Sequence, residues 1–298
     1  MRIKHIPVLL DQSIDQLITD PNGIYVDCTF GRGGHSRKIL ERLSDKGKLI
    51  AFDLDNEAME ESKSIKKKNF QFHKTNFSQI GKFFEDDSLM GVLIDCGVSS
   101  PQLDEPGRGF SFQKDGPLDM RFNKDQELTC SDIIENYSEK ELSQILWKLG
   151  EEEESRRIAK FIVKRRKVKR FESTTDLANL IELAKRKRTK KHSATKSFQA
   201  LRMAVNSELE NLSKCLEVLK TKLKRSGKLV VISFHSLEDR IAKQTFKTQP
   251  NLVEKKIPIF NDITQEKFTV SKVLLATDDE ISMNPRSRSA KMRLIEKL

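Results

Sequence analysis

The sequence predicts a doubly wound α/β fold interrupted by a helical insertion, and three observations support this class. Short apolar strands alternate with helical segments through the first hundred residues, which is typical of a parallel sheet built from βαβ units. The alternation stops after Asp95, and a strand pattern returns only at 227–233. The intervening segments look helical and are rich in Lys and Arg. We therefore expect one domain made of residues 1–102 and 195–298, and an inserted helical subdomain over 103–194.

Each element follows from an apolar run and the residues that end it. Gly23 to Phe30 is rich in apolar and β-branched residues and stops at a glycine cluster, as a buried parallel strand does. We expect right-handed crossovers between the strands. In chain order the sequence predicts a strand at 24–30, a helix at about 35–43, a strand at 48–52, a helix at about 57–67, strands at 70–73 and 91–95, and, within the insertion, helices at 138–149 and 155–166.

The first two strands end in acids that point to a nucleoside cofactor. Asp27 precedes the turn Gly31-Arg-Gly33-Gly34, whose glycines let the backbone approach a ligand closely. The second strand brings Asp53 to the same edge, where a carboxylate can accept hydrogen bonds from both hydroxyls of a ribose. A glycine turn alone can be only a tight connection, but Asp53 at the matching strand end favours a cofactor site.

The turn also distinguishes between cofactors. A dinucleotide fingerprint would have its third glycine at position 36, where this chain has Ser36. Adenosylmethionine has no pyrophosphate to bind and suits this looser turn. The loop after the fourth strand, from Asp95 to Asp104, reaches the same sheet edge and completes a three-loop site, in which Asp95 can hold an amino group.

Composition excludes several other classes. The four cysteines lie far apart without a C-x-x-C pair, and the five histidines show no ligand spacing, so we expect neither a disulfide framework nor a metal site. The amino-terminal apolar run is too short for a signal peptide, and no stretch reaches membrane-spanning length. We expect a soluble, cytoplasmic protein that does not bind a membrane.

Positive charge is concentrated in the insertion. Residues 151–200 hold 16 Lys or Arg against 7 Asp or Glu, a net of +9 out of +11 for the whole chain. Two dense runs, at 164–170 and 185–191, could neutralise nucleic-acid phosphates. A solvated helix face is the alternative for such runs. Within the first run the candidates for phosphate contact are Lys164, Arg165, Arg166 and Lys167.

One long amphipathic stretch precedes the fifth strand. Its apolar residues recur at intervals of three and four, so we expect a single stripe that packs on the sheet. The stripe comprises Leu201, Val205, Leu209, Leu212, Leu216, Leu219 and Leu223.

Six motifs in order make the chain resemble a known family. They are Asp27-Cys-Thr-Phe-Gly-Arg-Gly-Gly-His35, Asp95-Cys-Gly-Val-Ser-Ser-Pro-Gln102, Arg108-Gly-Phe-Ser-Phe112, Asp115-Gly-Pro-Leu-Asp-Met-Arg121, Ser233-Phe-His-Ser-Leu-Glu-Asp-Arg240 and Asn284-Pro-Arg-Ser-Arg-Ser289. Together they resemble the bacterial small-subunit ribosomal RNA cytosine-N4 methyltransferases of the MraW type. The resemblance implies a Rossmann-like class I methyltransferase that uses S-adenosyl-L-methionine and methylates the N4 amine of a decoding-region cytosine in 16S rRNA, free or within the small ribosomal subunit.

The resemblance also implies which residues form the site. The cofactor pocket would include Gly33, Gly34, His35, Asp53, Phe77, Asp95 and Gln102. Asp95 would be the catalytic residue, and His235 and Ser236 could border the base, although His235 could equally cap the next helix. Arg286 and Arg288 are further candidates for phosphate contact. Where the family has His-Pro-Ala-Thr-Arg, this chain ends the motif in Lys196, which removes an arginine's bidentate fork.

Two other functions compete with this interpretation. A non-catalytic RNA-binding ribosome assembly factor would explain the positive charge, but it has no need of Asp53, Asp95 and the glycine turn at one edge. A nicotinamide oxidoreductase would explain the sheet, but it would leave Ser36 and the basic insertion unexplained.

Overall fold

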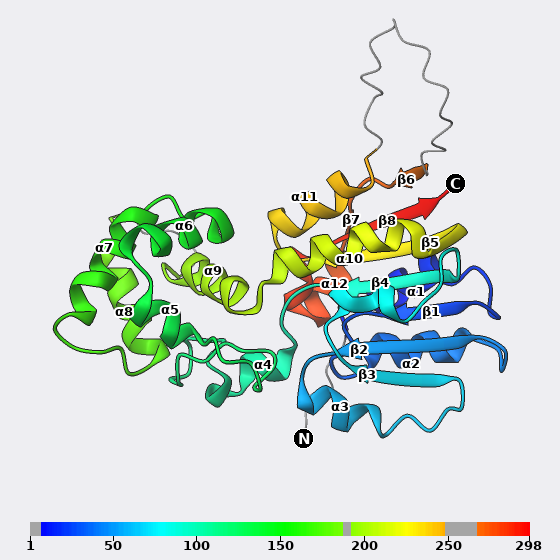
Figure 1. Cartoon of the computed structure of the whole chain (residues 1–298), viewed down its shortest axis with the longest axis horizontal. Helices are drawn as coiled ribbons and strands as arrows, with labels where there is room; N and C mark the ends of the chain where they lie inside the picture. The colour runs from blue at the N-terminus through cyan, green and yellow to red at the C-terminus, as the bar shows by residue number, and fades with distance from the viewer. Residues whose placement is uncertain (1–6, 187–191, 248–266) are drawn as a thin grey trace, which may run out of the picture. The chain divides into compact units, whose positions relative to one another are not determined.

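The computed structural model describes residues 7–186, 192–247 and 267–298 (Figure 1). These residues form two compact units. The first unit consists of Met1–Gly97 and Leu209–Leu298, and the second is continuous from Val98 to Glu208. The insertion predicted at 103–194 lies within the span of this second unit.

An eight-stranded sheet forms the first unit, with strand order β3-β2-β1-β4-β5-β8-β6 and with β7 paired to β8. The five strands from β3 to β5 run parallel, while β8 pairs antiparallel with β5, β6 and β7. The strands are β1 (Ile24–Asp27), β2 (Lys48–Asp53), β3 (Phe70–Lys74), β4 (Leu89–Asp95), β5 (Leu223–Ser233), β6 (Phe268–Val270), β7 (Leu274–Leu275) and β8 (Lys291–Lys297).

Alternation along the strands gives the sheet a core on each face. In β1, Tyr25 packs with the residues of one face and Val26 with those of the other, since successive side chains of a strand point to opposite sides. One core contains residues of α1 (Leu10–Leu17) and α2 (Gly34–Arg42). The opposite core contains residues of η1 (Phe77–Lys82), α10 (Glu208–Lys222) and α11 (Ser236–Thr245). The doubly wound arrangement is therefore confirmed.

The described part of the first unit also contains three short helices. α3 (Asn56–Ser62) begins at Asp55, whose side chain accepts a hydrogen bond from the Glu57 amide. This helix stops well before residue 67, so the sequence prediction for its end was wrong. Near the carboxyl terminus, α12 (Asp278–Met283) and η3 (Pro285–Ser289) lead into β8.

The described residues of the second unit form helices and loops without strands, around one apolar core of their own. Ser or Thr side chains cap three of its helices at Thr129, Ser138 and Ser173, which satisfies first-turn amides. The helices are α4 (Ser100–Asp104), η2 (Pro106–Arg108), α5 (Cys130–Asn136), α6 (Glu139–Gly150), α7 (Ser155–Arg166), α8 (Thr174–Ala184) and α9 (Thr195–Asn206).

The long amphipathic stretch is not one helix. Ser207 adopts a left-handed conformation (φ 49°) and separates α9 from α10. Leu201 and Val205 are buried in the core of the second unit, whereas Leu212 and the leucines after it are buried against the sheet. The prediction of a single stripe packed on the sheet is therefore wrong, because a local turn divides it between two cores.

No helix among the residues that the structure describes is long and apolar enough to cross a membrane.

Candidate active site

Acidic residues gather at the carboxyl ends of the parallel strands. Asp27, at the end of β1, pairs in register with Ala51 of β2 and Leu93 of β4. Asp53 and Asp95 are the last residues of β2 and β4. Since ligands of open α/β sheets bind at this edge, the three carboxylates mark the candidate site.

Asp53 fastens the glycine turn to β2. Its Oδ2 accepts a 2.7 Å hydrogen bond from the Gly31 amide, and its Oδ1 accepts one of 2.9 Å from the Asp55 amide. Burial raises the pKa of Asp53 above its ordinary value, and the amide donors partly oppose that rise. Each oxygen keeps a second lone pair, so the carboxylate can still accept hydrogen bonds from a ligand.

Close packing explains the glycines of the turn. Gly33 has φ +70°, and a Cβ there would lie 2.7 Å from Cζ of Phe30. A Cβ on Gly34 would lie 2.2 Å from Cγ of Pro7. Both distances are shorter than atoms tolerate, so neither position accepts a larger residue without movement of its neighbour.

Asp27 is fully buried behind the turn. Its Oδ2 accepts a 2.6 Å hydrogen bond from Ser36 Oγ, and its Oδ1 accepts one of 3.1 Å from the Thr29 amide. Burial raises the pKa of Asp27 to about 6, even though the hydrogen bond from Ser36 lowers it. Ser36 therefore stabilises the carboxylate at the end of β1. It occupies the position where a dinucleotide-binding fold would have its third glycine.

Asp95 carries an unused acceptor. Its amide donates a 2.8 Å hydrogen bond to Thr29 Oγ1, which fixes the end of β4 beside β1. Its Oδ1 is buried and accepts no hydrogen bond from any described residue. Burial, together with the negative charges of Asp27 and Glu238, raises the pKa of Asp95 well above its ordinary value. A buried acceptor without a donor is costly, so this atom is suited to a ligand that brings one.

His35 connects Asp95 to the amino-terminal segment. Its Nδ1 lies 3.9 Å from Asp95 Oδ2, and its Nε2 lies 3.2 Å from the carbonyl oxygen of Val8. The ring is buried at the start of α2. His35 therefore lies beside Asp95 at the strand end, and its role in the cofactor pocket stays a prediction. The sequence contains no signal for its contact with Val8.

The amino-terminal segment around Leu9 also contacts the chain near η3, which contains Arg286 and Arg288, the two predicted phosphate contacts of this unit. Glu280 Oε1 accepts hydrogen bonds from the Leu9 amide at 2.6 Å and from Ser287 Oγ at 2.9 Å. Arg286 and Arg288 flank Ser287 in η3 and are exposed. Sequence reasoning missed Glu280, which nothing in its local pattern distinguishes from a surface acid.

Beyond β5, the structure gives His235 a structural role. Its Nδ1 accepts a 3.2 Å hydrogen bond from the Leu237 amide, and this bond caps α11. Glu238, almost completely buried, accepts hydrogen bonds from the amides of Phe234 (2.8 Å) and His235 (3.0 Å). Glu238 adds a fourth carboxylate near the strand ends, and the sequence analysis did not single it out.

Two more predicted pocket residues have defined surroundings. Phe77 begins η1 and packs, half-buried, against the core beneath η1 and α10. Gln102 belongs to the second unit, where its Oε1 accepts a 2.9 Å hydrogen bond from the Ser99 amide and closes the capping box of α4.

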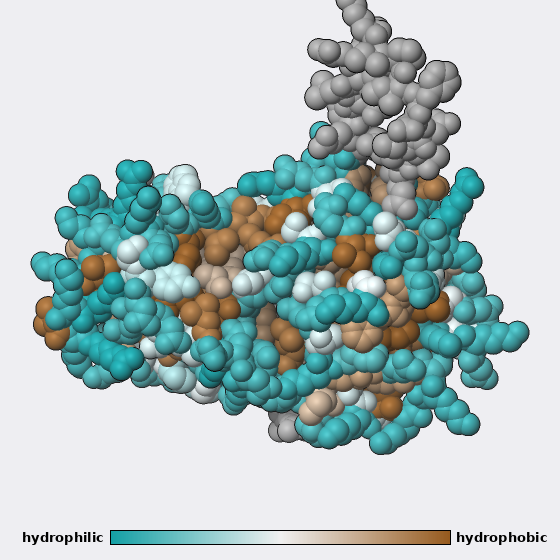
Figure 2. Space-filling view, viewed as in Figure 1, coloured by the Kyte–Doolittle hydropathy of each residue, from teal (hydrophilic) through white to brown (hydrophobic). Residues whose placement is uncertain are grey.

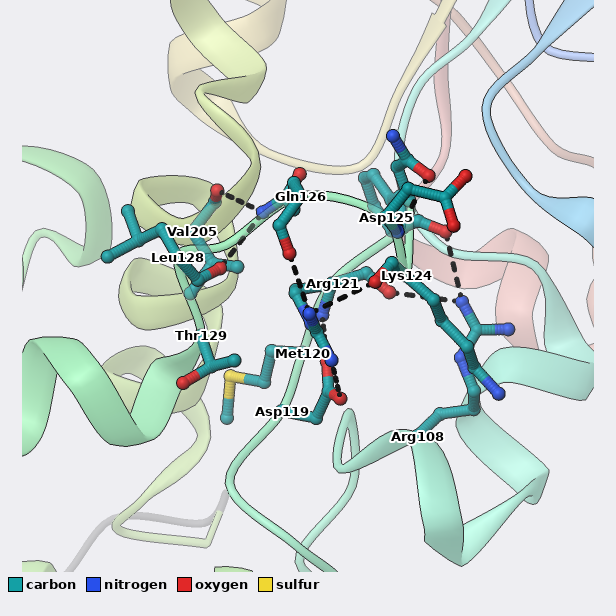
Figure 3. A network of polar contacts seen from close by, with 12 residues as sticks. Arg108, Asp119, Met120, Arg121, Lys124, Asp125, Gln126, Leu128, Thr129 and Val205 are labelled. Atoms are coloured by element: carbon teal, nitrogen blue, oxygen red, sulfur yellow. Dashed lines mark hydrogen bonds and ion pairs between the residues drawn. The ribbon is translucent and has the colours of Figure 1, made fainter.

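The motifs around Arg108 and Arg121 build a polar network in the second unit (Figure 3). Arg121 binds Asp119 through two nitrogens, each at 2.8 Å, and donates to the Gln126 carbonyl at 2.6 Å. The buried Arg108 donates to the carbonyls of Arg121 (3.0 Å) and Phe122 (3.2 Å). These arginines hold the loop before α5 in place, which accounts for both motifs structurally.

The predicted basic run at the end of α7 is mixed. Lys164 and Lys167 are exposed, whereas Arg165 and Arg166 are half-buried. In the second run, Lys185 pairs with the buried Glu152 at 2.8 Å. Residues 187–191 of that run lie outside the described residues.

The described residues contain no group of His, Cys, Asp and Glu that could hold a metal ion. A parallel sheet with an antiparallel β8 beside β5, acids at three strand ends and a glycine turn after β1 define a Rossmann-like class I methyltransferase. The chain belongs to the MraW methylase family, which it matches over residues 2–298.

Curated relatives agree with this assignment. The chain is 44% identical to the ribosomal RNA small subunit methyltransferase H of Fusobacterium nucleatum subsp. nucleatum, over 99% of this chain and 97% of that protein. It is 45% identical to the protein of the same name from Caldicellulosiruptor saccharolyticus, over 99% of both chains. The chain is thus an enzyme of the methyltransferase class.

Proposed function

We propose that this methyltransferase transfers a methyl group from S-adenosyl-L-methionine to the N4 amine of a cytosine in the decoding region of 16S rRNA. The observation that carries the chemistry is the buried, unpartnered Oδ1 of Asp95 at the end of β4. The RNA substrate is inferred from relatives, at 44–45% identity over almost the whole chain, that are named as small-subunit ribosomal RNA methyltransferases. A ribosomal substrate would place the enzyme in the cytoplasm.

The residues at the sheet edge suit this cofactor. Asp53 would accept hydrogen bonds from the ribose hydroxyls, and the turn through Gly33 and Gly34 would allow close approach to the backbone. Asp95, with its free acceptor, suits an amino group. The further candidates are His35, Phe77 and Gln102. When bound, adenosylmethionine supplies a methyl group made electrophilic by its sulfonium.

Asp95 has a second possible task on the substrate side. The lone pair of the cytosine amine is delocalised into the ring, so the amine is a weak nucleophile. A carboxylate that accepts its N–H hydrogen bonds would orient the nitrogen, and positioning of this kind can supply much of a rate enhancement. The hydrogen bond from the Asp95 amide to Thr29 would fix the backbone at the end of β4, and His35, 3.9 Å from Oδ2, would lie beside the carboxylate.

Carbon-5 methylation is less compatible with the site. Methylation at that carbon needs a cysteine nucleophile to activate the ring. Cys28 is buried, and burial raises the pKa of its thiol well above the ordinary value, which disfavours the reactive thiolate. Cys96, directly after Asp95, is only half-buried, so the preference for the amine rests on the acceptor that Asp95 offers rather than on the cysteines.

RNA contacts would come from basic residues in both units. In the second unit the predicted candidates are Lys164, Arg165, Arg166 and Lys167, of which the two lysines are exposed. In the first unit they are Arg286 and Arg288, on the loop that Glu280 anchors near Leu9. Enzymes that modify base atoms extrude the nucleotide or require an exposed one, so contacts with the flanking RNA backbone would help to hold it.

The competing functions fit less well. A non-catalytic assembly factor does not need the buried Asp95 acceptor, and the family is one of methylases. A dinucleotide-binding turn has a glycine at this position, which lets the helix pack closely on the strand. This chain has Ser36 there, and its hydroxyl is bonded to Asp27.

Nucleoside mass spectrometry tests the proposal. Small subunits and naked 16S rRNA from cells lacking the gene would be incubated with the purified enzyme and isotope-labelled adenosylmethionine. We expect one labelled methyl on the N4 of a cytidine with wild type, and none with Asp95→Ala. A methyl on carbon-5 or on a ribose oxygen, or no RNA product with either substrate, would show that the assignment is wrong.

A further inference from the structure

The helix α7 sorts its basic residues onto different faces. Its buried face consists of Ser155, Ile158, Ala159 and Ile162, which pack in the core of the second unit. Four basic residues are exposed along the opposite side. They are Arg156, Lys160, Lys164 and, at the carboxyl-terminal cap, Lys167.

The other basic residues of this helix serve the fold. Arg165 pairs with Asp176 at 3.2 Å, and its guanidinium lies 5.2 Å from the ring centre of Phe171. Arg166 donates a 2.5 Å hydrogen bond to the carbonyl of Ile134. These contacts tie the end of α7 to α5, to α8 and to the segment between α7 and α8.

Arg157 is engaged in the same way. Its Nε donates a hydrogen bond to the carbonyl of Ala184, at the end of α8, and its guanidinium lies 5.0 Å from the ring centre of Phe161. All three half-buried arginines of α7 therefore have partners inside the second unit, which sets them apart from the four exposed residues.

The four exposed residues form no ion pair with any residue that the structure describes. Their spacing of four, four and three residues places them on one side of the helix at steps of about 6 Å or less, from a rise of about 1.5 Å per residue. Like charges at such spacing repel one another and cost helix stability. A polyanion bound along the helix would relieve that repulsion.

We propose that Arg156, Lys160, Lys164 and Lys167 form a phosphate-binding ridge, the α7 ridge, for the backbone of the substrate RNA. This inference rests on the proposed function, since it assumes an RNA substrate. Contacts of this kind position a nucleic acid without reading its sequence. Figure 2 shows that hydrophilic residues dominate the visible surface of the helical unit, as a wet, polar interface requires.

The ridge includes only some of the basic residues predicted to contact phosphates at 164–167. Lys164 and Lys167 belong to it, together with Lys160, one turn before Lys164, and Arg156, two turns before it. Arg165 and Arg166 are assigned to the fold instead, because their guanidinium groups are already held by Asp176 and by the Ile134 carbonyl.

A matched pair of variants tests the ridge in the full chain. The ridge variant replaces all four residues with alanine. The control variant removes the same charge from four exposed lysines that lie before or at the beginning of β2, β3 and β5, far along those strands from the acidic ends: Lys46, Lys66, Lys68 and Lys224. The affinity of each protein for naked 16S rRNA is measured from low to moderate salt, together with its affinity for adenosylmethionine.

We expect the slope of log affinity against log salt to become shallower by roughly 3 in the ridge variant, because each lost phosphate contact changes it by about 0.7–0.9. The control should change the slope by much less, and both variants should keep wild-type affinity for adenosylmethionine. A slope equal to that of wild type, or an equal change in the control, would overturn the ridge.

Further measurements separate the ridge from the proposed function. Lys160→Ala alone should change the slope by about 0.7–0.9, and this single exposed substitution guards against loss of folding in the fourfold variant. Arg165→Ala should lower the midpoint of thermal unfolding and leave the slope nearly unchanged; the reverse result would contradict the ridge. The proposed function stands or falls separately, on whether wild type produces N4-methylcytidine.

Discussion

Ser36 Oγ donates a 2.6 Å hydrogen bond to Oδ2 of Asp27, and both residues are completely buried. The bond joins the first turn of α2 to the end of β1. A carboxylate in such a place is expensive to ionise, since burial disfavours its charged form. Ser36 is the only side chain among the described residues that donates a hydrogen bond to it.

This relationship predicts a pH-dependent effect of Ser36→Ala. The pKa of Asp27 is raised to about 6 in the folded protein, so Asp27 reduces stability as pH rises from about 4 to 6, by roughly 3 kcal/mol in total. Because Ser36 favours the ionised form, its removal should cost about 1.5–3 kcal/mol at pH 8 and less at pH 4.5. Urea denaturation at both pH values measures this difference.

Ser13→Ala is the matched control for that experiment. Ser13 is equally buried, but its Oγ donates a 2.9 Å hydrogen bond to the neutral carbonyl of Leu10. Ser13→Ala should therefore lower the free energy of unfolding by about 1 kcal/mol at either pH. If both variants show the same pH dependence, the Ser36 bond does not act through the charge of Asp27.

Asp53→Ala should weaken the binding of adenosylmethionine. The substitution removes the carboxylate expected to contact the ribose, and charge-assisted hydrogen bonds of this kind contribute about 1.5–3 kcal/mol each, so affinity should fall at least tenfold. Calorimetric titration measures the affinity. Asp45→Ala, an exposed residue in the loop before β2, should bind as wild type does. If Asp53→Ala binds adenosylmethionine as tightly as wild type does, the assignment of Asp53 to the cofactor pocket is wrong.

Asp95 should release protons when adenosylmethionine binds. Burial, with Asp27 and Glu238 nearby, raises the pKa of Asp95 well above its ordinary value, which favours the protonated form of the free enzyme. A positive group placed beside its carboxylate would lower that pKa and expel the proton. Calorimetry at pH 6 in two buffers of different ionisation heat should show a buffer-dependent heat for wild type and a smaller dependence for Asp95→Asn. Equal dependence in the two proteins would contradict this role.

Two glycines of the turn should respond differently to alanine. Gly31 has φ +54° and a Cβ there would meet only the Thr29 carbonyl at 3.9 Å, so Gly31→Ala should cost about 1–2 kcal/mol from backbone strain alone. Gly33→Ala adds a collision with Phe30, whose ring is buried and flanked by two other phenylalanines, and overpacking of this kind costs about 1–3 kcal/mol more. Equilibrium unfolding of both variants measures the difference, and equal losses would exclude the steric effect.

The strand ends could be predicted from the sequence because their signal is local. Asp27, Asp53 and Asp95 each end an apolar run, and the parallel order of those runs brings them to one edge. The contact of His35 with Val8 and that of Glu280 with Leu9 join residues far apart in the chain, and no periodicity encodes them. The site's frame was therefore predictable, and its supporting contacts were not.

One wrong prediction and one prediction that the structure subdivides have a common physical cause. Apolar spacing continues unbroken through Ser207, yet one residue in a left-handed conformation redirects the chain. Likewise, the run from Lys164 to Lys167 is uniform in charge, but consecutive residues of a helix turn by about 100°, so they face both inward and outward. The composition of a segment therefore does not show which of its residues are buried and which are exposed, because that depends on the elements that pack against it.

The discontinuity of the first unit bears on how the protein is made. β4 ends at Asp95, and its partner β5 begins only at Leu223. During synthesis β4 therefore cannot pair with β5 until more than a hundred further residues have been made. The second unit is continuous from Val98 to Glu208, and its apolar core contains only its own residues. It can therefore fold first on the ribosome. A folded body between two strands costs less closure entropy than a slack loop of equal length, so the helical unit would act as a folding scaffold for the sheet that it interrupts.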